Sequence, residues 1–112
     1  MSKRTDYPLF NHWFKTLDWL MHFCERLPKH LRFSLSQRIL QHGLDIIELI
    51  TEAIYVKDRI PLLKQINRRL EILRILIRIC HHRRHLSVKQ YRYINEQIDT
   101  AGRMVGGWMK TL

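Results

Sequence analysis

Residues 62–80 are LLKQINRRLEILRILIRIC, the stretch that decides the fold of this chain. Apolar residues recur in it at steps of three and four, the spacing that places side chains on one face of an α-helix. This face consists of Leu62, Leu63, Ile66, Leu70, Leu73, Ile77 and Cys80. A second apolar set lies roughly opposite at about 100° per residue, and its members are Ile72, Ile75, Leu76 and Ile79. Because a helix in a small monomeric bundle buries only one face, we expect the second face, with Ile72, Ile75 and Ile79, to contact another subunit.

Three further segments show the same helical spacing. Two of them open with a pair typical of a capping box, Ser34 with Gln37 and Ser87 with Gln90. The sequence therefore predicts four helices, over residues 8–27, 34–56, 59–84 and 87–110. Joined by short connections, they pack most simply as an up-down-up-down four-helix bundle. This is an all-α fold, and a length of 112 residues suits a single domain over residues 1–112.

The predicted core draws on all four helices. The first helix contributes Leu9, Phe10, Trp13, Leu17, Leu20, Met21, Cys24 and Leu27. The second contributes Leu35, Ile39, Gly43, Ile46, Ile50, Ala53 and Ile54, and the fourth contributes Tyr91, Ile94, Ile98, Ala101, Val105 and Trp108.

The chain is strongly basic, with a formal net charge of +10 at pH 7. The excess is concentrated in residues 59–85, which hold eight Lys and Arg and one carboxylate, whereas residues 34–58 carry a net charge of −2. A segment dense in arginine is typical of a surface that binds a polyanion, and the alternative is a solvated face that serves solubility. The candidate nucleic-acid contacts are Lys64, Arg68, Arg69, Arg74, Arg78, Arg83 and Arg84, together with Arg103 of the fourth helix.

Arg74 and Arg78 stand out because they lie four residues apart within a run of leucine and isoleucine, and so share one helix face. Charges in such a stretch must be paired inside, extend to solvent, or line an aqueous groove in which a phosphate binds. Glu71 and Glu48 are candidate internal partners. A structural ion pair and a phosphate-binding groove both remain open.

The fourth helix raises the same question at Arg103, which lies between Gly102 and Gly106. Glycines in a helix cost about 1 kcal/mol each, a loss that is usually offset by close approach of a neighbouring backbone. We therefore expect Gly102 and Gly106 to lie at an oligomer interface or beside a ligand, with fraying near the C-terminus as the alternative.

The sequence contains no glycine-rich phosphate loop, no G-x-S-x-G elbow and no H-E-x-x-H motif. We therefore expect neither an enzyme nor a bound cofactor. The histidines of residues 80–85 suggest a metal site, but Arg83 and Arg84 between them repel a cation and no structural-zinc spacing is present. We expect no metal there, because histidines at a helix end commonly complement the helix dipole.

The two cysteines, Cys24 and Cys80, are too few for a disulfide framework and are expected to pack as small apolar side chains. Charges interrupt the apolar runs every few residues, and residues 1–6 lead into no long apolar segment. We therefore expect neither a membrane span nor a signal peptide, and a cytoplasmic location.

Seven short motifs, taken in order, resemble a known protein family. They are residues 27–29 (LPK), 32–39 (RFSLSQRI), 53–55 (AIY), 61–65 (PLLKQ), 70–74 (LEILR), 90–91 (QY) and 102–108 (GRMVGGW). In order and spacing they resemble the four-helix-bundle family that contains the accessory variability determinant (Avd) of diversity-generating retroelements. The resemblance extends over about residues 9–110.

This resemblance implies a barrel-shaped homopentamer of four-helix bundles with a basic surface. It further implies a protein without enzymatic activity, which binds the reverse transcriptase of the retroelement and nucleic acid, RNA or DNA. Such a protein supports the mutagenic copying of a template repeat into a variable gene. The paired arginines of the family's third helix fall on Arg74 and Arg78, and the Gly-Arg of its fourth helix falls on Arg103.

The same superfamily includes small proteins encoded in intervening sequences of large-subunit ribosomal RNA genes. The alternative function is therefore an RNA-associated four-helix bundle without a polymerase partner. A neighbouring reverse-transcriptase gene with template and variable repeats favours the first function, whereas a position inside a ribosomal RNA gene favours the second.

Overall fold

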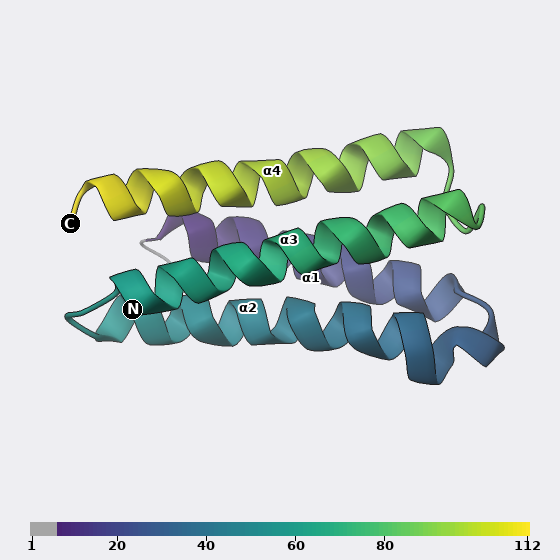
Figure 1. The fold of residues 1–112 in the computed structure, drawn as a ribbon, viewed down its shortest axis with the longest axis horizontal. Coiled ribbons are helices and arrows are strands. Elements are labelled where there is room, and N and C mark those ends of the chain that lie inside the picture. The colour runs from purple at the N-terminus through teal and green to yellow at the C-terminus, as the bar shows by residue number, and fades with distance from the viewer. Residues whose placement is uncertain (1–6) are drawn as a thin grey trace.

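Four α-helices run in alternating directions in the computed structural model, which describes residues 7–112 (Figure 1). They are α1 (Pro8–Arg26), α2 (Gln37–Tyr55), α3 (Ile60–His82) and α4 (Val88–Lys110). Two short helical segments, η2 (Lys29–Leu31) and η3 (Arg32–Ser36), connect α1 to α2. Residues 7–112 contain no strand, which confirms the all-α fold with four helices. Residues 1–6, on which the expectation of no signal peptide partly rests, lie outside the described residues.

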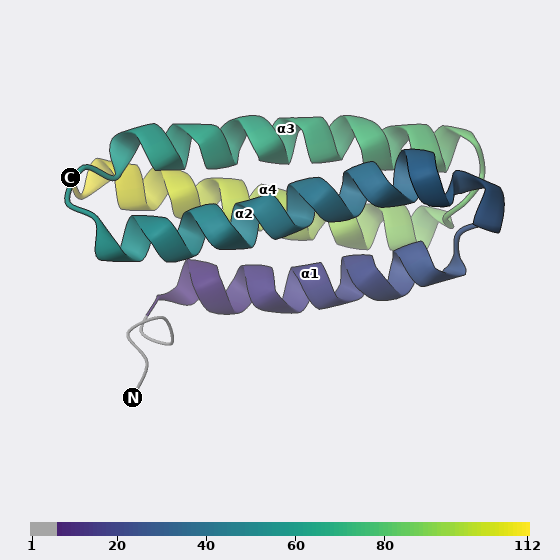
Figure 2. The same ribbon diagram turned by 90° about the horizontal axis from the view of Figure 1, so that it is seen from below.

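Each helix packs against the next one in the chain, and α4 closes the bundle against α1. Consequently α1 and α3 lie diagonally across the bundle, and Figure 2 shows them at its opposite edges. This is the up-down-up-down arrangement that the sequence predicts, with principal extents of 42 × 23 × 22 Å. No helix bound differs from its predicted position by more than three residues.

One of the two predicted capping boxes forms. At the start of α4, Ser87 Oγ accepts a hydrogen bond from the Gln90 backbone N–H at 3.1 Å, and Gln90 Oε1 accepts one from the Ser87 N–H at 2.9 Å. The capping box predicted at Ser34 and Gln37 is wrong. The backbone is already helical through η3, so Ser34 is not an extended N-cap residue, and its hydroxyl donates to the Leu31 carbonyl at 3.3 Å instead.

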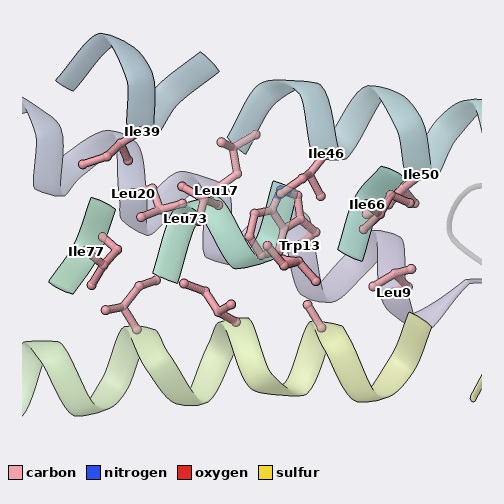
Figure 3. Packing of buried hydrophobic residues seen from close by; sticks show 14 of the residues in the cluster. Leu9, Trp13, Leu17, Leu20, Ile39, Ile46, Ile50, Ile66, Leu73 and Ile77 are labelled. Atoms are coloured by element: carbon pink, nitrogen blue, oxygen red, sulfur yellow. The ribbon is translucent and has the colours of Figure 1, made fainter. Parts of the chain in front are cut away.

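The core forms along the bundle axis from side chains of all four helices (Figure 3). Trp13 is fully buried near its centre, and its indole N–H donates to the Gly43 carbonyl oxygen at 2.9 Å. Gly43 fits closely at this crossing, because a Cβ there would lie only 2.9 Å from Leu17 Cδ1. A larger residue at this position would therefore require the Leu17 side chain to shift within the packed core.

The buried face of α1 differs from the prediction at several residues, since Phe10 is only partly buried and Thr16 is buried. Met21, predicted in the core, is exposed, and Phe23 is buried in its place. The ring of Phe23 stacks on Trp19 with centroids 5.5 Å apart, and Trp19 in turn contacts Tyr93 of α4. These aromatic contacts turn the buried face of α1 toward α4, which leaves Met21 on the outside.

Candidate nucleic-acid interface

Arg74 extends from α3 toward α4, where two carboxylates hold its guanidinium. Its Nη1 donates to Glu71 Oε1 one turn earlier on α3, while Nε and Nη2 lie 3.1 and 3.0 Å from Asp99 Oδ1 on α4. The side chains of Glu71 and Asp99 are 68% and 52% exposed. Water therefore solvates both ion pairs, and Arg74 is paired at the surface rather than in the interior.

The guanidinium of Arg74 forms one wall of an open groove between α3 and α4. The groove has a volume of about 420 Å³ and is lined by Asn67, Arg74, Asp99, Gly102 and Arg103. Gly102 lies against Arg74, since a Cβ at this position would be 3.4 Å from Arg74 Nη2. Arg103 donates from Nη2 to Thr100 Oγ1 at 3.0 Å, a neutral partner that leaves its charge uncompensated. The structure thus brings Arg74 and Arg103 together in one groove, beside Gly102.

Arg78 lies one turn beyond Arg74 on the same side of α3 and is exposed. Its side chain makes no hydrogen bond or ion pair with any residue in the described range 7–112. Lys64, also exposed, lies about 80° around the helix from Arg74 and only about 20° from Ile75, given 100° per residue, so it points outward from the bundle. Within the described residues, the α4-facing side of α3 therefore presents one free cation, Arg78, one turn beyond the paired Arg74.

Not all basic residues of this segment lie on that side. Arg69 points toward α2, where Nη1 lies 3.0 Å from Asp45 Oδ2 and 3.1 Å from His42 Nδ1. Arg59 donates to the carbonyl oxygens of Val56 and Ile54 at 3.1 and 3.3 Å, at the end of α2. Arg69 thus connects α3 to α2, whereas Arg59 precedes α3 and its guanidinium also lies over the Trp108 ring of α4, 5.3 Å from the ring centroid. The basic segment therefore does not form a single stripe.

Arg83 and Arg84 mark the end of α3 and are both exposed. The His85 N–H donates to the Cys80 carbonyl at 2.8 Å and the Arg84 N–H donates to the His81 carbonyl at 2.9 Å, the two hydrogen bonds of a Schellman motif. Arg84 takes the left-handed position of this motif with φ 64°, where glycine is the usual residue. The turn directs two further charges into solvent at this end of the bundle.

The second apolar face of α3 remains uncovered within a single chain. Ile72, Ile75 and Ile79 are 40%, 57% and 39% exposed, and Arg68 is exposed on the same outward side. Gly102 lies in the groove between α3 and α4, and a Cβ added at Gly106 would meet no atom within 4 Å. The isoleucines and the glycines therefore occupy different sides of the α3–α4 pair.

His81, Cys24 and Cys80 pack within the bundle. The ring of His81 stacks on Tyr91 with centroids 4.0 Å apart and an interplanar angle of 4°. Burial raises the pKa of Cys24 to about 12 and that of Cys80 to about 11, so both thiols stay protonated at neutral pH. Among the described residues, no group of three or more His, Cys, Asp or Glu side chains is arranged to hold a metal ion.

Asn67 and Asp99 line the groove without having been predicted. Their place there depends on the relative position of two helices, which spacing within one helix does not reveal. A partial signal exists for Asp99, which precedes Gly102 by three residues and so shares its helix face. None of the four long helices, as far as the structure describes the chain, combines the length and apolar character needed to cross a membrane.

Comparison with protein families supplies the context for these features. A family model described as bAvd-like matches residues 10–112, which include nearly all of α1 and the whole of α2, α3 and α4. No curated protein matches the chain. Since the match extends over nearly the whole sequence and agrees with the four-helix fold, this chain belongs to the bAvd-like family.

Proposed function

We propose that this protein is the accessory subunit of a diversity-generating retroelement, where it binds the reverse transcriptase and nucleic acid and supports mutagenic copying of the template repeat into a variable gene. Membership of the bAvd-like family over residues 10–112 is the observation that carries the proposal. That family is not a known enzyme family, so the role proposed here is to bind the reverse transcriptase and nucleic acid.

The charges on the α4-facing side of α3 support a nucleic-acid contact. Arg74 is already neutralised by Glu71 and Asp99, so the charges available to a phosphate are those of Arg78 and Arg103. A guanidinium provides two parallel N–H groups that match two phosphate oxygens. Arg78 and Arg103 are accordingly the primary contacts in this proposal, and Arg74 orders the groove between them.

Arginine contacts of this kind bind the phosphate backbone and do not distinguish one base from another. Binding is therefore expected to tolerate changes of base sequence and to weaken steeply as salt rises. Further positive charges lie along α3 and at its end, at Lys64, Arg83 and Arg84. A long RNA or DNA strand could therefore contact the protein at several points.

The exposed isoleucines of α3 support the homopentamer within this proposal. An apolar stripe formed by Ile72, Ile75 and Ile79 is costly to leave in water, and a neighbouring copy would bury it. The open position at Gly106 offers a second place for close approach of that copy.

The test is co-expression of the chain with the tagged reverse transcriptase encoded beside it and with the RNA of the template repeat. We expect the two proteins to elute together and copying of the template to depend on the chain. Double replacement of Arg78 and Arg103 by alanine should reduce copying without dissociating the oligomer. If the two proteins do not associate and the gene lies inside a ribosomal RNA gene, the proposal fails in favour of the intervening-sequence type.

A further inference from the structure

A second groove, remote from the arginines of α3, lies between α1 and α4. It has a volume of about 470 Å³, and its aromatic residues are Phe14, Trp19, Phe23 and Tyr93. Trp19 and Phe23 are nearly parallel, with an interplanar angle of 11°, and Trp19 contacts Tyr93 at a centroid distance of 5.5 Å. The groove thus presents a row of aromatic rings supported from behind by the bundle.

Two of these rings have no role in the core. Phe14 is 61% exposed and Tyr93 is 42% exposed, although folding would favour a polar residue at such positions. Phe14 contacts Phe10 at its edge, with ring centroids 6.1 Å apart, which leaves most of its ring in solvent. Exposed aromatic rings that gather in a hollow mark a surface that binds something.

Cations accompany the rings at both ends of the groove. Lys15 and Arg26 line it, are exposed, and form no ion pair with any other described residue. They lie eleven residues apart on α1, about 16 Å along the helix axis. One carboxylate, Asp18, also lines the groove, and His22 Nδ1 lies 3.7 Å from its Oδ2. With Lys15 and Arg26 against Asp18, the groove carries one excess positive charge.

The groove is separate from the apolar face of α3. Because α1 and α3 are diagonal in the bundle (Figures 1 and 2), the isoleucine stripe on the outer side of α3 and the groove between α1 and α4 lie on different sides of the bundle.

We propose that this groove binds the unpaired bases of a single-stranded nucleic acid, which stack on Phe14 and Tyr93 while Lys15 and Arg26 contact the flanking phosphates. Aromatic rings between cations fit a polyanion whose bases have apolar faces, and the span of about 16 Å accommodates a few nucleotides. A duplex hides these faces, so the groove selects unpaired strand. The inference rests on the proposed function for its class of ligand but assigns a different site.

Fluorescence anisotropy of the full chain tests this site with two labelled strands of twelve nucleotides, one of thymidine and one abasic. The abasic strand keeps the phosphates and lacks the bases. Phe14→Ala and Tyr93→Ala should each weaken binding of the thymidine strand by about five-fold or more, in line with alanine substitutions at stacking platforms, and leave binding of the abasic strand unchanged. Lys15→Ala should weaken binding of both strands.

Phe33→Ala is the matched control, because Phe33 is 84% exposed and lies on η3, outside the groove. It should bind both strands as the unmodified chain does. Equal binding of the thymidine strand by Phe14→Ala, Tyr93→Ala and the unmodified chain would overturn the inference. So would normal strand binding together with loss of the reverse transcriptase, since the groove would then dock a protein. The inference also fails if the unmodified chain binds neither strand. Failure of the proposed function is measured separately, as a lack of association between the chain and the reverse transcriptase in the co-expression test.

Discussion

Replacing Arg78 with alanine, compared with the same change at Arg69, tests whether nucleic-acid binding depends on where a positive charge lies on α3 or only on the net charge of the protein. Both substitutions remove one positive charge from the same helix. Arg78 is exposed and has no partner among residues 7–112, whereas Arg69 is held by Asp45 and His42 on the opposite flank. If nucleic-acid binding depends only on net charge, the two variants weaken it equally. If it depends on the free cations beside the α3–α4 groove, Arg78→Ala weakens binding and Arg69→Ala does not.

For stability we expect the larger effect from Arg69→Ala and the smaller effect from Arg78→Ala. Arg78→Ala removes a solvated side chain without contacts and should change the free energy of unfolding by less than about 0.5 kcal/mol. Arg69→Ala removes an ion pair at 3.0 Å and a hydrogen bond to a half-buried histidine, so it should cost about 1 kcal/mol. For a domain of this size, that cost lowers Tm by roughly 4 °C.

Two measurements on each variant give the comparison. Circular dichroism at rising temperature yields Tm, and fluorescence anisotropy with one labelled RNA strand at several salt concentrations yields the affinity and its salt dependence. Loss of one phosphate contact should reduce the slope of log K against log salt by about 1. We expect this reduction for Arg78→Ala and for Arg103→Ala, and an unchanged slope for Arg69→Ala.

Substitutions at Arg74 and Asp99 test whether carboxylates in the groove weaken nucleic-acid binding. Its charge is offset by Glu71 and Asp99, so Arg74→Ala should reduce affinity less than Arg78→Ala does, and the exposed ion pairs imply a stability cost of about 1 kcal/mol rather than several. Asp99→Asn removes one of the competing carboxylates and should strengthen binding.

Two results would refute this reasoning. One is an equal loss of affinity in Arg69→Ala and Arg78→Ala, which would mean that the position of a charge on α3 has no effect on binding. The other is a sharply lowered Tm with unchanged binding in Arg74→Ala, which would make Arg74 a structural ion pair only.

Further expectations concern assembly, capping, backbone conformation and pH. Ile75→Asp should dissociate the oligomer, because a lone carboxylate is costly to bury among apolar side chains, and light scattering that shows a monomer for the unmodified chain would contradict this. Ser87→Ala should lower stability by about 1 kcal/mol in denaturant melts, since it removes the cap of α4. Arg84→Gly should raise Tm slightly, because glycine adopts the left-handed conformation with φ 64° without strain; a fall in Tm would show that the arginine side chain itself stabilises the turn. Burial and the nearby Arg69 guanidinium lower the pKa of His42 below its ordinary value of 6.5. The unfolded chain therefore binds a proton more readily than the folded one, and stability should fall as pH drops through 6.5. In His42→Gln, Tm should decrease less between pH 7 and pH 5 than it does in the unmodified chain.

The sequence singled out three of the five residues that line the groove, Arg74, Gly102 and Arg103, but it did not reveal how their charges are paired. Arg74 and Arg78 share a face because they are four residues apart, and Gly102 and Arg103 are consecutive, so each pair follows from local spacing. The pairing of Arg74 with Asp99, twenty-five residues away, follows only from the contact between α3 and α4. That contact decides that Arg78 is the free cation and Arg74 the paired one.

The sequence by itself determined the four helices, nearly all of the core, the cap at Ser87 and the second apolar face of α3. These properties depend on hydrophobic periodicity and on hydrogen bonds within a few residues, both of which are local. Only the tertiary structure decided that Arg69 faces Asp45 while Arg74 faces Asp99, and that Phe23 replaces Met21 in the core. The physical reason is that the relative rotation and register of helices result from packing of the whole core, in which close-packed side chains such as Trp13 against Gly43 leave one arrangement.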